Sequence, residues 1–313
     1  MRDLGMRATR EAYGDALAEF GARYDFVVLD ADLSGSTKTA VFQAAFPERF
    51  VNCGIAESNM MAVAAGIAAT GRVAFASTFA MFAAGRAFDA VRNGIGYPGL
   101  NVKIGASHAG LSVGEDGATH QCNEDLALMR SIPGMTVLCP ADAVTTRAAV
   151  RAAIEHPGPF YLRLGRLAVP TIYGDDAAFA LGRGILLREG RDVAIVATGL
   201  MVARALQAAD LLAAEGIDAA VVDMHTIKPL DEALLTALAA RCGAVVTAEE
   251  HSVIGGLGGA VAECLCRTRP VPVLPVGVPD VFGCSGKAEQ LLTHFGLTAG
   301  HIAEVARQAV SLK

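Results

Sequence analysis

The order of apolar and polar positions along the chain alternates between two kinds of segment. Short apolar runs, typical of buried strands, lie at Phe26–Leu29, Val102–Ile104, Thr136–Leu138 and Phe160–Leu164. Longer amphipathic or alanine-rich segments, typical of helices, lie at Thr9–Gly21, Glu57–Ala69, Phe82–Asn93 and Asp142–Glu155. This alternation predicts a mostly parallel sheet covered by helices on both faces.

The alternation pauses over Arg166–Gly184, where glycines, prolines and the Asp175–Asp176 pair indicate a linker. Beyond it, strands are predicted at Val193–Ala197, Ala219–Val222, Val245–Ala248 and Val271–Pro275. Helices are predicted between them at Met201–Glu215, Asp231–Arg241 and Gly256–Arg267, with Asp231 as an N-cap. We therefore expect two three-layer α/β domains, over residues 1–175 and 191–313, joined by a linker over 176–190.

Composition narrows the class of protein. Of the 313 residues, 53% are hydrophobic and 19% are charged, with a net charge of −6 and no basic block. This balance predicts folded domains and argues against nucleic acid or an anionic membrane as a partner. The longest apolar stretches, Ser58–Gly71 and Val73–Gly85, are interrupted by arginines, and each is shorter than the ~20 residues that span a bilayer.

The cysteines and the N-terminal residues indicate in which cellular compartment the protein is expected. The sequence has seven cysteines and no C-x-x-C pair, so neither a disulfide framework nor a zinc site is expected. Arg2, Asp3 and Arg7 are not followed by an apolar core of the kind found in signal peptides. We expect a cytoplasmic protein without a metal site of its own.

Acidic residues stand at two predicted junctions of the first domain. Asp30 and Asp32 follow a strand, where parallel sheets bind ligands, although a loop that starts a helix explains them equally well. Glu57 opens a helix that is almost wholly apolar. Capping of that helix would account for Glu57, but a carboxyl group in such a setting either finds a partner or stays protonated, so it is also a candidate for proton chemistry.

The segment from His108 to Gln121 has the strongest functional character. It follows a predicted strand and holds three glycines, two acids and two histidines, His108 and His120. The spacing of the histidines matches no common zinc pattern, whereas imidazoles that hold and protonate a substrate oxygen fit well. Elsewhere, Phe79 and Phe82 form an aromatic pair, and Arg10 and Arg163 could bind an anion, although core packing and surface arginines are the plainer interpretations.

Together these segments resemble the thiamine-diphosphate-dependent transketolases, specifically their pyrimidine-binding and C-terminal domains. The resemblance covers essentially the whole chain. It rests on the order and spacing of Ala8–Arg10, Ala31–Leu33, Phe46–Pro47, Arg49–Phe50, Gly54–Met60, Ser77–Phe79, His108–Gln121, Pro140–Asp142, Lys228–Leu230 and Glu249–His251.

The resemblance implies roles for the cofactor-facing residues. Glu57 is similar to the glutamate that bonds a ring nitrogen of the cofactor's aminopyrimidine, and Phe79 and Phe82 to the aromatic wall on which that ring stacks. Asp32 matches a residue near the cofactor. A tyrosine that some relatives have three residues after the second phenylalanine is Gly85 here.

The resemblance also implies roles toward the substrate. Asp116 and His120 match positions that hold the ketose hydroxyls, with His120 near the proton transfers at the cleaved bond. His108, Arg10, Ser36 and Arg163 match positions that hold the substrate phosphate. Pentose and heptulose phosphates are the default substrates, but a specialised phosphorylated or sulfonated ketose would leave similar marks.

The family's Gly-Asp-Gly segment, which binds the diphosphate and a divalent metal, does not occur in this sequence. We therefore expect a separate N-terminal subunit to supply the diphosphate domain and Mg²⁺, in an α2β2 assembly that is active only as a pair. The rivals are the beta subunit of a 2-oxo-acid dehydrogenase, which would lack the loop from Asp116 to Gln121, a deoxyxylulose-phosphate synthase relative, and a non-catalytic scaffold subunit.

Overall fold

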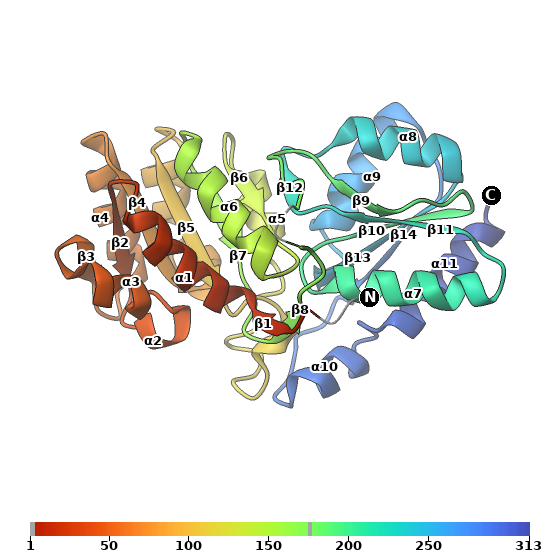
Figure 1. Ribbon diagram of the computed structural model, residues 1–313, viewed down its shortest axis with the longest axis horizontal. Coiled ribbons are helices and arrows are strands. Elements are labelled where there is room, and N and C mark those ends of the chain that lie inside the picture. The colour runs from red at the N-terminus through yellow and green to blue at the C-terminus, as the bar shows by residue number, and fades with distance from the viewer. Residues whose placement is uncertain (1–3, 175–176) are drawn as a thin grey trace.

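The computed structural model describes residues 4–174 and 177–313, which form two α/β domains side by side (Figure 1). The Asp175–Asp176 pair of the predicted linker lies outside the described residues. The first domain has a seven-stranded sheet in the order β12-β6-β7-β5-β4-β2-β3, and the second a five-stranded sheet in the order β14-β13-β10-β11-β9. Within these two sheets, as the described residues form them, only the edge strands β12 and β9 pair antiparallel, so the expected fold of two mostly parallel α/β domains is confirmed.

The central strands read as unbroken apolar runs because helices cover both of their faces. The first sheet comprises β2 (Phe26–Asp30), β3 (Phe50–Asn52), β4 (Val73–Phe79), β5 (Val102–Ser107), β6 (Thr136–Leu138), β7 (Phe160–Arg163) and β12 (Thr226–Lys228). The second comprises β9 (Ile185–Arg188), β10 (Val193–Ala197), β11 (Ala219–Asp223), β13 (Val245–Ser252) and β14 (Val273–Val278). A separate ribbon pairs β1 (Met6–Ala8) with β8 (Ala168–Pro170).

The helices fall into layers on either side of each sheet. In the first domain α1 (Thr9–Gly21) packs against α6 (Ala143–Glu155), while α4 (Glu57–Ala69) belongs to the other core together with α5 (Asp125–Ser131). In the second, α7 (Met201–Ala214) packs against α11 (Ala299–Ser311), and α8 (Glu232–Cys242) against α9 (Leu257–Thr268). Short helices are α2 (Ser34–Thr37), α3 (Ala40–Ala45) and α10 (Ala288–His294). No helix in the described part of the chain has the length and hydropathy to cross a membrane.

Three local predictions can be compared with the structure. Asp231 caps α8 as expected, since its side chain accepts a hydrogen bond from the Leu234 N–H at 3.1 Å. The single helix expected over Phe82–Asn93 is wrong: two π-helical segments, η2 (Met81–Arg86) and η3 (Ala90–Gly96), replace it, in a stretch whose glycines weaken helix propensity. The last strand, expected over Val271–Pro275, runs instead from Val273 to Val278.

The two domains share structure across their boundary. Strand β12, which follows β11 of the second domain, adds to the edge of the first sheet beside β6 (Figure 1). Strand β9 lies in the segment expected to be linker, yet it forms an edge of the second sheet. One hydrophobic core includes Met60 of α4 and Leu257 of α9. The two domains are therefore packed directly against each other through a shared sheet edge and a shared core.

Candidate active site

Several predicted site residues leave the first sheet at its carboxyl edge. Asp32 follows β2, Phe79 ends β4 and His108 follows β5. In the strand register Phe79 pairs with Ser107, the residue before His108. The carboxyl edge is where open parallel sheets bind ligands, and the topology brings these residues together from positions far apart in the sequence.

The aromatic and imidazole side chains at this edge form one stack of rings. The Phe79 and Phe82 centroids are 5.7 Å apart with the ring planes 14° from parallel, and His108 stacks on Phe79 at 3.8 Å. His120 approaches Phe82 edge-on at 5.4 Å. Both predicted histidines and both predicted phenylalanines thus lie in one cluster, in arrangements that aromatic quadrupoles favour.

His108 is buried and held from two sides. Its backbone has the positive φ of 57°, and its Nδ1 and Nε2 lie 2.9 Å from Ser107 Oγ and 3.3 Å from Arg10 Nη1. Because a guanidinium only donates, Nε2 accepts from Arg10 and Nδ1–H donates to Ser107. Burial, together with nearby Arg10 and Arg166, lowers the pKa of His108 to about 3, so its ring is neutral at physiological pH.

Arg10 lies at the centre of a cluster of cationic side chains. It donates from Nη1 to the Ser36 carbonyl oxygen at 2.8 Å, and its buried Nε has no hydrogen-bond partner in the described structure. Burial lowers the pKa of Arg10, as does the charge of Arg166, against the influence of Glu11. A guanidinium with an unused donor beside a second arginine is suited to receive an anion.

Asp116 and Arg166 stand at the exposed side of this cluster. Their nearest charged atoms are 3.9 Å apart, and Arg166 also donates to the Val113 carbonyl oxygen. The Arg166 side chain is 37% exposed, so it can reach a ligand in solvent. His120, four residues beyond Asp116, lies with its Nδ1 2.9 Å from Thr119 Oγ1.

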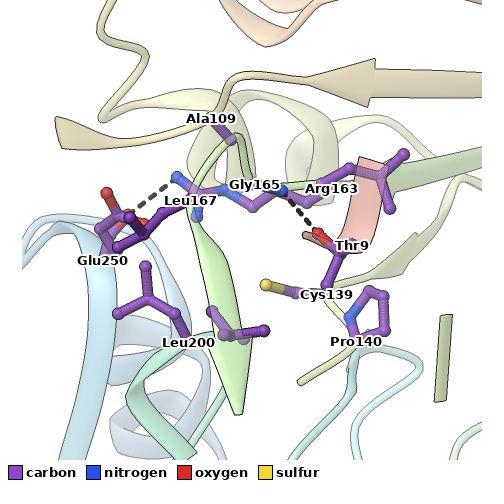
Figure 2. Close-up of a pocket in the computed structure, with 12 residues that line it drawn as sticks. Thr9, Ala109, Cys139, Pro140, Arg163, Gly165, Leu167, Leu200 and Glu250 are labelled. Carbon is purple, nitrogen blue, oxygen red and sulfur yellow. Dashed lines mark hydrogen bonds between the residues drawn. The ribbon is translucent and has the colours of Figure 1, made fainter. Parts of the chain in front are cut away.

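The expectation that Arg163 joins the anion cluster is contradicted by its contacts. Its Nε donates to both carboxylate oxygens of Asp125, at 3.1 and 2.8 Å, and its Nη2 donates to the carbonyl oxygens of Cys122 and Glu250. Burial disfavours its charge, yet the Asp125 carboxylate raises the pKa of Arg163 well above its ordinary value. Arg163 lines a small cavity between the domains together with Thr9 and Glu250, and Figure 2 shows its bond to Glu250 there.

Residues of the second domain contact the loop His108–Gln121, which includes both histidines. Glu250 of β13 accepts hydrogen bonds from the Ser112 N–H at 2.6 Å and from its hydroxyl at 3.3 Å. The buried Gln121 donates to the Cys284 carbonyl oxygen at 2.9 Å, and Gly117 has no room for a Cβ beside Ser285. Burial raises the pKa of Glu250 to about 7, against the influence of Arg163.

Glu57 opens α4 and is almost fully buried, with 2% of its side chain exposed. Its two carboxylate oxygens accept from Arg86 Nη1 at 3.1 and 3.0 Å. The Arg86 guanidinium lies over the Phe82 ring, 4.5 Å from its centroid. The predicted carboxylate and aromatic wall are therefore neighbours, and one arginine contacts both.

The two aspartates after β2 differ. Asp30 is buried and accepts from the Leu33 N–H and from the hydroxyls of Thr37 and Thr39, so it fixes the loop. Asp32 is exposed at the positive φ of 64° and accepts from Asn52 Nδ2 at 2.9 Å. Of the two, only Asp32 is available to a ligand.

Comparison with known proteins assigns both domains. The transketolase pyrimidine-binding domain family matches residues 5–171, and the transketolase C-terminal domain family matches residues 182–302. The chain belongs to the transketolase family. A putative transketolase C-terminal section of Methanocaldococcus jannaschii is 49% identical over 302 residues, covering 95% of each chain. A 6-deoxy-6-sulfo-D-fructose transketolase subunit of Clostridium sp. strain MSTE9 is 46% identical over 305 residues, covering 97% of this chain and 95% of the other.

A solved structure agrees over the same range. It is described as a split gene transketolase, inactive beta4 tetramer, and it is 57% identical, with a TM-score of 0.92 over 99% of this chain and 100% of the other. The chain is thus similar along its whole length to transketolases made as separate subunits.

Transketolases generally depend on thiamine diphosphate, and the residues around Glu57 fit its aminopyrimidine. That ring is flat and offers both a nitrogen and an amino group. Phe82 presents an aromatic surface, and the buried Glu57 carboxylate beside it can bond a ring nitrogen. Thr78 adds a buried hydroxyl without a partner in the described residues. This transketolase-family chain therefore has the chemistry for that half of the cofactor.

Sequence reasoning missed three residues of this transketolase site. Arg163 ends strand β7 and Arg166 follows it three residues later. The position of buried Asp125 decides which of the two forms a buried ion pair. Arg86 gave no signal beyond interrupting an apolar run. Glu250 lies in a motif that supported the family resemblance, but its contact with Ser112 crosses 138 residues and could not be read from spacing.

Proposed function

We propose that this chain is the C-terminal subunit of a two-chain, thiamine-diphosphate-dependent transketolase. With a separate diphosphate-binding subunit, in an α2β2 assembly, it transfers a two-carbon ketol unit from a ketose phosphate to an aldose phosphate. The observation that carries the proposal is the adjacency of two side-chain clusters: Glu57 with Phe82, and Arg10 with Arg166, joined by the ring stack that includes His108.

Glu57, Phe79 and Phe82 would hold the aminopyrimidine, with Asp32 nearby. When bound, thiamine diphosphate supplies the carbon nucleophile that accepts the ketol unit. The buried Glu57 carboxyl would bond the ring nitrogen and position a proton there. We infer that the partner subunit would hold Mg²⁺, because the Gly-Asp-Gly segment with which the family binds it does not occur in this sequence.

The histidines and the cationic cluster would act on the sugar. Asp116 accepts bonds from the ketose hydroxyls, and His120 exchanges a proton with the hydroxyl next to the cleaved bond. His108 is neutral, so Nε2 can accept a hydrogen bond from the substrate once its arginine partner turns to an anion. Arg10, Arg166 and the backbone near Ser36 would hold the phosphate.

The anion cluster restricts the substrate class to ketoses with a negative group at the far end. Pentose and heptulose phosphates of the pentose phosphate pathway satisfy this condition, and so does the sulfonated sugar named for the Clostridium relative. We infer cytoplasmic carbohydrate metabolism, in which cysteines remain as thiols.

The test mixes this chain with a transketolase N-terminal subunit from the same organism, thiamine diphosphate, magnesium, xylulose 5-phosphate and ribose 5-phosphate. We expect ketol transfer in the mixture and none with either chain alone. Glu57→Gln should lower turnover at least ~100-fold while the complex still forms, because a positioned proton-transfer group contributes on that scale. Glu48→Gln, on an exposed turn, is the matched control and should keep full activity.

Two results would contradict the proposal. If the pair bound the cofactor but transferred no ketol unit from any anionic ketose, the reaction would be wrong. If Glu57→Gln kept turnover near that of Glu48→Gln, the assigned role of Glu57 would be wrong even with an active pair.

A further inference from the structure

We propose that Arg86 occupies the place of the aminopyrimidine ring, beside Glu57 and Phe82, until the cofactor displaces it. The inference rests on the proposed function and extends it to how the pocket is kept before loading. One side chain contacts both surfaces that the cofactor ring needs, the Glu57 carboxylate and the Phe82 ring.

The position of Arg86 follows from the local backbone. Residues 81–86 form the π-helical segment η2, and the Ala87 N–H donates to the Phe82 carbonyl oxygen five residues back, at 3.0 Å. Such i→i+5 turns are rare and are found frequently at functional sites. The wider turn brings Arg86 over the face of Phe82. Gly85, the residue before Arg86, has no room for a Cβ, because the Met81 side chain fills that space.

The Arg86 guanidinium resembles an aminopyrimidine ring in shape and in the groups that it contacts. It is planar, it lies 4.5 Å from the Phe82 centroid, and its Nη1 bonds both oxygens of Glu57 at 3.0–3.1 Å. An aminopyrimidine would use the same carboxylate as a partner and the same kind of aromatic face for stacking. The guanidinium and the ring therefore compete for one place.

The two partners of this ion pair differ in burial. Glu57 is 2% exposed, so its carboxylate needs a partner before the cofactor binds, whereas Arg86 is 53% exposed and can turn into solvent. Ser58 Oγ, which donates to the Arg86 carbonyl oxygen at 3.3 Å, ties the backbone and leaves the side chain free to move. Arg86 thus satisfies the carboxylate before the cofactor binds and can turn away when the ring takes its place.

Displacement of Arg86 would also free Glu57 for its proposed role. While both carboxylate oxygens accept hydrogen bonds from Arg86 Nη1, the carboxyl group cannot bond a ring nitrogen of the cofactor in the same place. Loading of the cofactor and availability of Glu57 are therefore coupled through Arg86.

The test measures binding, with a readout that does not depend on turnover. The dissociation constant of thiamine diphosphate is determined by equilibrium dialysis, with Mg²⁺, for the reconstituted pair carrying wild-type chain, Arg86→Ala, Arg86→Lys or Arg72→Ala. Arg72 provides the matched control because it pairs with Asp25 at 2.8 Å at the opposite end of β4. Thermal unfolding of each variant confirms that the subunit is folded.

We expect Arg86→Ala to bind the cofactor about tenfold more tightly, since an open fraction near one tenth weakens apparent affinity by that factor. Arg86→Lys should fall between, because lysine keeps the charge and loses the planar stack. Arg72→Ala should bind as the wild type. Unchanged or weaker binding by Arg86→Ala, with tight binding by the wild type, would overturn the inference alone. Absence of cofactor binding in every variant would overturn the proposed function and the inference together.

Discussion

Arg163 and Arg166 stand three residues apart on one segment and serve opposite purposes. Arg163 is 5% exposed, and its Nε and Nη2 donate to Asp125 and to two carbonyl oxygens. Arg166 is 37% exposed, and its nearest carboxylates are 3.9 Å away. The first arginine joins two domains, and the second faces the site.

The contrast shows that the partners which a charged side chain already has, more than its residue type, separate a structural role from a binding one. The charge of a buried guanidinium that is paired with a buried carboxylate is already compensated and does not need an anionic ligand. A half-exposed guanidinium beside Arg10 and neutral His108 keeps donors and suffers repulsion that an anion would relieve. Each prediction below changes one side of this comparison.

The largest effect is expected at the saturated arginine. Arg163→Met keeps the volume but leaves the Asp125 carboxylate buried without its cation, and we expect a loss of about 3–5 kcal/mol in the free energy of unfolding. Urea unfolding of the chain measures it. The double variant Arg163→Met with Asp125→Asn should recover part of the loss, because the orphaned charge is removed with its partner. Equal losses in the single and the double variant would contradict the pairing.

Glu250, on the same interdomain contact, should give a pH-dependent difference. Its folded pKa of about 7 lies above the ordinary 4.5, so the folded state holds this proton more firmly. That contribution to stability is complete below pH 4.5 and is lost as pH rises through 7. Glu250→Gln removes the titratable carboxyl group. Relative to wild type, its free energy of unfolding should therefore rise by about 3 kcal/mol between these pH limits. Unfolding free energies at pH 4.5 and 8 test this, and a constant difference would contradict it.

The fold followed from the sequence wherever local pattern decides the outcome. The bounds of α1 and α4 are those expected, because each helix has a continuous apolar face and a clear boundary. The exchange of β12 into the first sheet was not foreseen, since pairing between distant segments leaves no periodicity in the chain. The π-helical turns at Met81–Arg86 were missed because their hydrogen bonding differs from that of an α-helix without a distinct residue pattern.

The site followed from the sequence only in part, for a related reason. Glu57, Phe79, Phe82, His108 and His120 were named, and the topology brings them to one edge of the sheet. The choice between Arg163 and Arg166 depends on which of them meets Asp125, and that is a property of packing rather than of spacing. Charged residues are harder to assign than rings, because a charge takes its role from its partner.

The smallest effect on stability, with the clearest effect on function, is expected at the unsaturated arginine. Arg166→Ala should change the free energy of unfolding by less than about 0.5 kcal/mol, as surface substitutions generally do. In the reconstituted pair it should raise KM for a phosphorylated ketose about 10- to 100-fold, the worth of one hydrogen bond to a charged group. KM for a non-phosphorylated ketose should stay within about twofold.

Arg166→Lys is the control for this last prediction, because lysine keeps the charge but not the two-pronged geometry of the guanidinium. It should recover part of the KM for the phosphorylated ketose. If Arg166→Ala impaired both ketoses equally, Arg166 would be acting on the loop through Val113, which its guanidinium also bonds, and not on the phosphate. In that case the difference between the two arginines would be one of exposure alone, and the anion would have to be bound by Arg10 without Arg166.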